Sequence, residues 1–200
     1  MATRSLTYTE SFSRVNMFFS VLSGAVISLA LIAQAGRFGD TFIVAAIMLL
    51  STVLFVGYAT IGRLIVINLD DLRWVVGMNR LRHAYMEMHP ELEQYFSAGW
   101  HDDARGISLT MGLEGMPHRS RLANLAHGVQ TLPGMLGVIV AVVAGALGAL
   151  IAVAFGAPQI LAVGAGVAAS LLSIGVVFVL GWRSIRGYAK GLAPRFPTPE

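Results

Sequence analysis

The stretch that decides the fold runs from Gly128 to Trp182 and reads GVQTLPGMLGVIVAVVAGALGALIAVAFGAPQILAVGAGVAASLLSIGVVFVLGW. It contains no Asp, Glu, Lys, Arg or His. One membrane crossing takes about 20 apolar residues, so this run is too long for one helix and sufficient for two. The sequence FGAPQ at 155–159 has the Gly and Pro of a tight turn. We therefore predict a membrane hairpin with spans near 132–156 and 159–182.

The composition of the whole chain places it in the membrane class. Of its 200 residues, 56% are hydrophobic and 12% are charged, whereas soluble domains are about 45–50% apolar and about 25% charged. The chain has no cysteine, which excludes disulfides, thiolate metal ligands and cysteine nucleophiles. It also has no phosphate-binding loop, dinucleotide glycine fingerprint or nucleophile elbow.

Two further uncharged runs precede this stretch, at 15–35 and 41–62, and a short turn separates them. The triplet AQA at 33–35 has the form of a signal-peptide cleavage site. The apolar core of a secretory signal is usually 7–15 residues long, and the leader here carries an acidic Glu10. We therefore predict an uncleaved first helix, and four membrane spans in all.

The distribution of Arg and Lys predicts the orientation, because cytoplasmic loops of membrane proteins are enriched in these residues. Thirteen of the fourteen lie in the N-terminal segment, in residues 63–131 or in the tail after Trp182. Both termini and the central segment are therefore expected in the cytoplasm. The bias toward Arg over Lys, with abundant Ala, Gly and Val, is typical of GC-rich bacterial genomes, so we expect the bacterial inner (plasma) membrane.

The predicted fold class is all-α: a polytopic membrane protein with four transmembrane helices as two hairpins and a helical cytoplasmic insert. Its parts are the N-terminal hairpin 1–62, the insert 63–131, the C-terminal hairpin 132–182 and a basic, proline-containing tail 183–200. Because of Pro194, Pro197 and Pro199, we expect the last residues of the tail to be extended and mobile. The lipid bilayer is the expected partner, and a nucleic-acid partner is not expected, because the insert has seven arginines against eight acidic residues.

Within the insert, apolar side chains recur at heptad-like spacing on a helix that continues the second span. Pro90 is predicted to end this helix and to begin a short one that reaches Phe96. Residues 99–115 read as a loop, and residues 119–130 as an amphipathic helix. Because an exposed apolar row usually has a cover, the row is the candidate interaction surface, formed by Trp74, Met78, Leu81, Tyr85 and Met88.

A polar cluster is the second candidate in the insert. Its members are His83, Glu87, His101, Asp102 and Asp103. His83 and Glu87 are four residues apart and share a helix face, and such side chains can ligate a metal. Their spacing matches no established signature such as His-Glu-x-x-His. Ion pairs and solvated loop charges explain them more simply, so we predict no metal, cofactor or catalytic residue.

Small residues recur at every fourth position in three of the predicted spans and permit close helix packing. Four spans offer enough internal partners to favour packing within one bundle over a subunit interface. No ionisable side chain lies inside a span, which disfavours proton-coupled or sodium-coupled transport, although an apolar pore stays possible. The small positions are Ser20, Gly24 and Ser28; Ala144, Gly148, Ala152 and Gly156; and Ala162, Gly166 and Ser170.

The run NRLRHAY at 79–85, followed by PELE at 90–93 and HDD at 101–103, resembles a group of uncharacterised bacterial four-helix integral membrane proteins. The resemblance covers about residues 79–103. It implies that the insert is a defined small unit, and it brings no activity, cofactor or binding residue with it.

Three functions from different classes follow from these features. The leading hypothesis is a non-enzymatic interaction or sensing subunit that acts through its insert, with a membrane protein or a second copy as partner. The first alternative is a homo-oligomeric channel or membrane-permeabilising effector, with the small residues as subunit contacts. The second alternative is a membrane-surface enzyme with a His and acidic site near 83–103.

Overall fold

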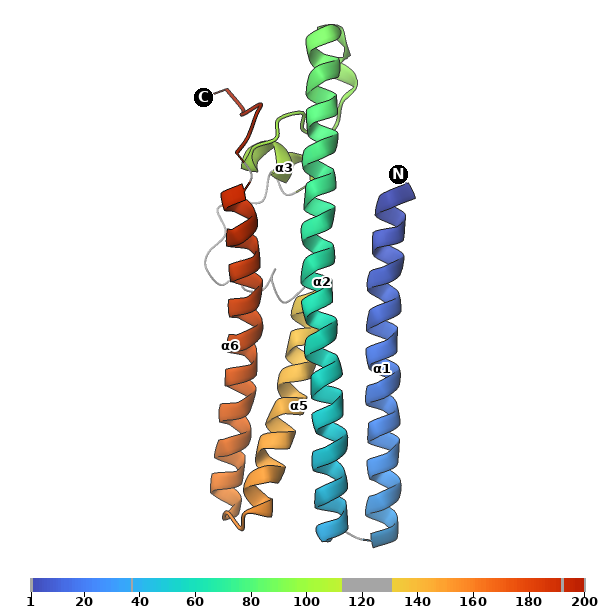
Figure 1. Cartoon of the computed structure of the whole chain (residues 1–200), viewed down its shortest axis with the longest axis vertical. Coiled ribbons are helices and arrows are strands. Elements are labelled where there is room, and N and C mark those ends of the chain that lie inside the picture. The colour runs from blue at the N-terminus through green and yellow to red at the C-terminus, as the bar shows by residue number, and fades with distance from the viewer. Residues whose placement is uncertain (1, 37, 113–130, 192, 200) are drawn as a thin grey trace.

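The computed structural model of the chain describes residues 2–36, 38–112, 131–191 and 193–199 (Figure 1). These residues form helices and no strand, so the predicted all-α class is confirmed for this part of the chain. The helices are α1 (Ala2–Gly36), α2 (Asp40–Met88), the 3-10 helix η1 (Pro90–Tyr95), α3 (Ala104–Thr110), α5 (Leu132–Ala154) and α6 (Gln159–Gly191).

Four of these helices, α1, α2, α5 and α6, are long and apolar enough to cross a membrane. Each contains one of the uncharged runs. The start of α5 shows how the sequence defines a boundary: Thr131 Oγ1 accepts a hydrogen bond from Gly134 N–H at 3.2 Å. Pro133 occupies the first turn, where its missing N–H leaves no hydrogen bond unmade. The proline therefore helps to begin the helix and does not interrupt it.

The four long helices lie side by side, and both turns that join them in pairs lie at the same end of the bundle (Figure 1). One turn follows α1, and the other is formed by residues 155–158 between α5 and α6. Gly156 has a φ of 77°, in the left-handed region where a side chain is strained. The chain reverses there within a few residues, so α5 and α6 are antiparallel neighbours.

The core lies where α1, α2 and α5 meet. Phe18 of α1, Val53 of α2 and Val140 of α5 are buried and belong to one cluster. Gly57 lets the three helices approach, because a Cβ atom there would lie 2.6 Å from a Val140 methyl and 3.1 Å from the Phe18 ring. A larger residue at 57 would therefore push α5 away from α2.

Small residues allow an equally close contact between α5 and α6. A Cβ atom on Gly148 would lie 2.7 Å from that of Ala169, and Ser170 Oγ donates to the carbonyl of Ala141 at 2.9 Å. Several small positions of the third and fourth spans therefore serve packing within the chain, as favoured from the sequence. Gly24 on α1 differs, because no atom lies within 4 Å of where its Cβ would be.

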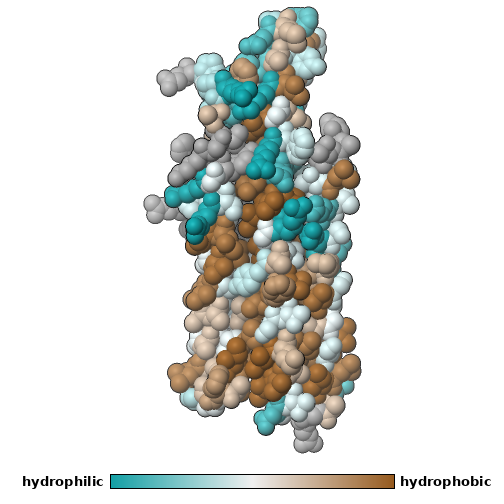
Figure 2. Space-filling view, viewed as in Figure 1, coloured by the Kyte–Doolittle hydropathy of each residue, from teal (hydrophilic) through white to brown (hydrophobic). Residues whose placement is uncertain are grey.

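The outer surface of the bundle is apolar. Figure 2 shows hydrophobic residues over its lower part and hydrophilic residues gathered toward the other end. Large side chains such as Met48, Phe55 and Leu172 are about 70% exposed. A contiguous apolar surface of this kind is unusual for a soluble monomer, and it is the surface that lipid would cover.

The insert begins as an extension of α2, which runs for 49 residues without a break. The predicted continuation of the second span as a helix is therefore confirmed. The short helix after Pro90 is also present, as η1, and it ends at Tyr95. The expectation of a loop over 99–115 is wrong in part, because α3 forms within it. Asp103 caps α3 by accepting a hydrogen bond from Gly106 N–H, and this capping signal was missed. The predicted helix 119–130 lies outside the described residues.

Candidate functional site

Asn79 of α2 organises the insert. Its side chain is fully buried, and Nδ2 donates to the carbonyl oxygens of His101 at 2.8 Å and Gly106 at 3.1 Å. Its Oδ1 accepts from Arg82 Nη1 at 2.8 Å and from Thr110 Oγ1 at 2.9 Å. Both donor hydrogens and both acceptor positions of the amide are thus used. One side chain therefore fixes α3 and the loop before it against α2.

Two glycines make this fixation possible. A Cβ atom on Gly106 would collide with the carbonyl of His101, and one on Gly99 would collide with the carbonyl of Gly106. Both glycines are buried. The backbone of the loop and the backbone of α3 can therefore approach each other closely enough for Asn79 to bind both.

Asp102 lies beside this centre and holds the C-terminal tail. The residue is buried, with 3% of its surface exposed. Its carboxylate accepts a hydrogen bond from Arg80 Nε at 2.7 Å. It also accepts the backbone N–H groups of Arg195 at 3.0 Å and Phe196 at 2.8 Å. Burial acts to raise the pKa of Asp102, but these hydrogen bonds outweigh it, and the pKa lies below the usual aspartate value. The side chain is therefore a charged acceptor at neutral pH.

Asp103 binds the tail two residues further on. Besides capping α3 through Gly106 N–H at 2.8 Å, it accepts the backbone N–H and the hydroxyl of Thr198, each at 3.0 Å. Burial acts to raise the pKa of Asp103, and the bonds from Gly106 and Thr198, with the nearby His101, lower it overall. The same carboxylate thus joins the start of α3 to the tail.

Phe196 completes the contact. Its ring stacks on His83 with centroids 4.2 Å apart, and its carbonyl accepts Asp102 N–H at 3.2 Å. His101 Nδ1 lies 3.3 Å from the same oxygen. The expectation that the tail is mobile is therefore wrong for Arg195, Phe196 and Thr198, which are bound to the insert. We call the whole arrangement the tail clasp: Asn79, Arg80, His83, His101, Asp102 and Asp103 of the insert, with Arg195, Phe196 and Thr198 of the tail.

The structure brings most of the polar cluster together, around the C-terminal tail. His83 and His101 have ring centroids 5.6 Å apart, and both aspartates face the tail. Glu87 is exposed at the edge, with its Oε1 3.6 Å from His83 Nε2. Among the described residues, no group of three His, Asp or Glu side chains is placed to hold a metal ion. The arrangement is suited to holding an extended peptide through its N–H groups.

Sequence reasoning missed Asn79, Phe196 and Thr198 as site residues. For Asn79 a signal was present, because it lies four and three residues after the buried Val75 and Val76, on the same helix face. A polar residue on an apolar face indicates a buried hydrogen-bonding position. For Phe196 and Thr198 we find no such signal. Their backbone N–H groups are ones that nearly every residue has, and the partners of the Phe196 ring and the Thr198 hydroxyl lie about a hundred residues earlier in the chain.

The apolar row lies on a different face of α2 from the buried Asn79. Trp74, Leu81, Tyr85 and Met88 are 50–65% exposed, and Met78 is half-buried. Four covers for the row follow from the sequence: the predicted helix 119–130, the short helix after Pro90, a second copy or a partner protein. The first of these, which the sequence favours, lies outside the described residues. The role of the row as an interaction surface thus stays a prediction.

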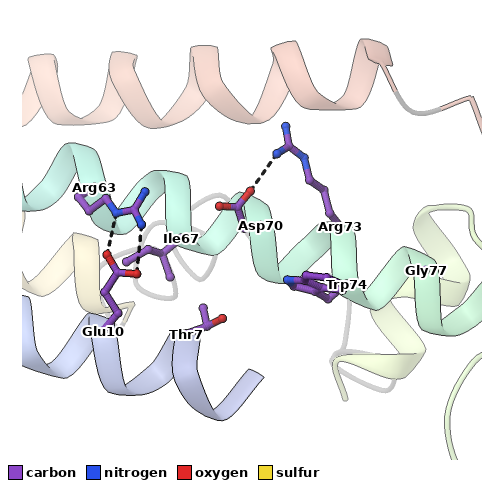
Figure 3. A pocket seen from close by; sticks show the side chains of 8 residues that line it. All are labelled: Thr7, Glu10, Arg63, Ile67, Asp70, Arg73, Trp74 and Gly77. Carbon is purple, nitrogen blue, oxygen red and sulfur yellow. Dashed lines mark hydrogen bonds and ion pairs between the residues drawn. The ribbon is translucent and has the colours of Figure 1, made fainter. Parts of the chain in front are cut away.

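A hollow of about 500 Å³ separates α1 from α2 where the apolar part of the bundle ends (Figure 3). Arg63 and Glu10, which are hydrogen-bonded to each other, line one part of it, and Asp70, Arg73 and Trp74 line it further along α2. Its lining thus contains charged side chains of both signs.

Comparison of the chain with protein-family models, with curated proteins and with solved structures finds no match. The class of protein therefore rests on the fold and the site. The chain is an all-helical protein, over its described residues, with four helices fit to span a membrane. Beside them it has a polar insert that binds the chain's own C-terminal tail.

Proposed function

We propose that the chain is a multi-pass protein of the bacterial inner membrane, in which α1–α2 and α5–α6 cross as two hairpins. The insert 63–131 and both termini are cytoplasmic. The Arg and Lys distribution supports this orientation. The arrangement in Figure 1 agrees with it, since the two turns lie at one end and the insert and both marked chain ends lie toward the other.

The function we propose is that of a non-enzymatic interaction or sensing subunit that acts through the insert. The exposed apolar row on α2 is the observation that carries this proposal. Leu81 and Met88 are more than 60% exposed, and they lie beyond the uncharged part of α2, where lipid does not reach them. Apolar side chains clustered outside the bilayer favour a protein partner, either another membrane protein or a second copy.

The other two functions have less support. A channel built from the small residues of α5 and α6 is less favoured, because Gly148 and Ser170 pack within the chain. An enzyme with its site near 83–103 is less favoured, because both aspartates already accept several hydrogen bonds from the insert and the tail.

Site-specific photo-crosslinking tests the proposed function. A photoreactive residue at Leu81 or Tyr85 reports on the row, and one at Glu87 serves as the matched control. Glu87 is equally exposed but points away from the row, because six residues of helix turn it by about 240°. Native membranes that contain the full chain are irradiated, and the adducts are identified by mass spectrometry.

We expect one defined adduct from Leu81 and Tyr85 and none from Glu87. An adduct with another copy of the chain would identify self-association as the interaction. Adducts that are absent from the row, or equally frequent at Glu87, would contradict the proposed function.

A further inference from the structure

The tail lies on the insert as a bound peptide does. Residues 193–199 form no helix, and along them Phe196 and Thr198 are half-buried whereas Arg195 and Pro197 are exposed. Alternate residues of an extended chain point to opposite sides. One side therefore carries the aromatic ring and the hydroxyl to the insert, and the other faces outward. Extended peptides commonly bind proteins in this way, through backbone groups and alternate side chains.

The two aspartates match the backbone pattern of the tail. Between 195 and 198, every N–H group the tail possesses is bound: those of Arg195 and Phe196 by Asp102, and that of Thr198 by Asp103. Pro197 has no N–H group and falls in the gap between the two carboxylates. The site thus suits a segment in which proline separates an aromatic residue from a threonine.

The insert side of the clasp is held in place by contacts that do not involve the tail. Arg80 fixes Asp102 at 2.7 Å, and Gly106 N–H fixes Asp103 at 2.8 Å. Asn79 anchors the backbone of the same loop and of α3. A site that keeps its shape without its ligand loses little conformational entropy on binding. The prolines that flank Phe196 limit the entropy lost by the tail as well.

We infer that the insert carries a peptide-binding site for an extended segment of the aromatic-proline-threonine type, and that the chain's own tail is its exchangeable ligand. Departure of the tail leaves Arg80 as the one hydrogen-bond partner of the buried Asp102 carboxylate among the described residues, and an under-satisfied buried carboxylate is unfavourable. Exchange of one segment for another is therefore preferred to an empty site. This peptide-binding site does not include the exposed apolar row on α2. The inference and the proposed function can therefore be disproved independently of each other.

The experiment compares the same full chain before and after its tail is cut. A protease recognition sequence is inserted after Gly191, and the purified protein in detergent is cleaved and then dialysed. The probe is a fluorescent peptide with the sequence of residues 193–199, and its binding is followed by anisotropy. In the uncut chain the tethered tail competes at an effective concentration on the order of millimolar, so we expect binding at least about tenfold weaker than after cleavage.

Substitutions in the peptide keep the test independent of protein folding. Phe196→Ala in the peptide removes the ring that stacks on His83, and we expect about tenfold weaker binding or more. Arg195→Ala is the matched control, because Arg195 binds Asp102 through its backbone N–H, which alanine keeps. This peptide is expected to bind within about twofold of the original. On the protein, Asp102→Asn is expected to weaken binding of all three peptides.

Three results would overturn the inference. The cut protein binds no peptide; it binds the Phe196→Ala peptide as tightly as the original; or the uncut and cut proteins bind equally well. A large loss with Arg195→Ala alone would also do so, because it would assign the binding to nonspecific attraction of a basic peptide.

Discussion

Arg63 of α2 binds Glu10 of α1 through two parallel hydrogen bonds, from Nε at 2.8 Å and from Nη2 at 3.1 Å. The pair lies where the uncharged runs of both helices end, and Arg14 joins it through Glu10 at 3.2 Å. Such forked pairing fixes orientation as well as distance. It sets the register of α1 against α2 at the polar end of the bundle.

The first prediction is that Glu10→Gln lowers the melting temperature in detergent by about 2–3 °C, because the pair is partly exposed and such pairs contribute modestly. The charge-swapped double variant Glu10→Arg with Arg63→Glu should recover part of the loss. Arg73→Gln is the control, since Arg73 pairs with Asp70 of the same helix. Equal effects of the two single variants would show that the pair between helices has no special role.

The second prediction concerns orientation. Reporter fusions at Phe38, in the first turn, and at Gln159, where α6 begins after the second turn, should read as external. Fusions at Trp100 and after Glu200 should read as cytoplasmic. The Arg and Lys distribution gives the reason. An external signal at Trp100 would contradict the proposed topology.

The third prediction concerns the contact of α5 with α6. Gly148→Leu should destabilise the protein by about 1–3 kcal/mol, because the new side chain meets Ala169 and the carbonyl of Ala165. Gly164→Leu is the matched control on α6, where no atom lies within 4 Å of the added Cβ, and it should have almost no effect. Thermal unfolding in detergent measures both. If the two variants behave alike, the close packing seen at Gly148 is not essential.

The fourth prediction is that Asn79→Ala unfolds the insert locally. It leaves the carbonyls of His101 and Gly106 without their amide donor, at a cost of about 2–4 kcal/mol. Hydrogen exchange should rise in α3 and stay unchanged in α5. Asn68→Ala is the control, because Asn68 is exposed on the same helix. Unchanged protection of α3 in the Asn79 variant would show that other contacts hold the insert.

The fifth prediction is the pH dependence of the clasp. The pKa values of Asp102 and Asp103 are lowered in the folded protein, so their contribution to tail binding is fully present above the pKa of a free aspartate, about 3.9. It is lost as the pH falls from there through the lowered values. A spin label on Pro199→Cys, in a chain that otherwise has no cysteine, should be immobile from pH 8 to 5 and become mobile below about pH 4.

A transition of that label near pH 6 would contradict this assignment. It would show that groups other than the two aspartates control release of the tail.

The long helices could be predicted from the sequence because their signal is local: each run of about 20 uncharged residues is sufficient by itself. The continuation of α2 past Arg63 was predictable from the heptad-like spacing for the same reason. That spacing did not show which face packs inside the chain, however. The row from Trp74 to Met88 is exposed, and the neighbouring face with Val75, Val76 and Asn79 is buried.

The clasp could not be predicted, because its parts are distant in sequence and join through groups without a sequence signature. Asp102 and Phe196 are 94 residues apart, and the donors are backbone N–H groups. The aspartates were singled out as chemically notable, but their ligand was not. Prolines at 194, 197 and 199 suggested mobility, although an extended conformation is also what a docked peptide needs.

Because α2 is one unbroken helix, a small tilt at one end of it displaces the other end by a larger distance. At about 1.5 Å per residue, its 49 residues span about 70 Å. A tilt of about 10° within the bilayer, which is well inside the range helices adopt, moves the far end by roughly 12 Å. Changes in membrane thickness or in the packing of α1 are thereby magnified at Met88. Under the proposed function, a partner bound at that end would respond to such a tilt without contacting the lipid.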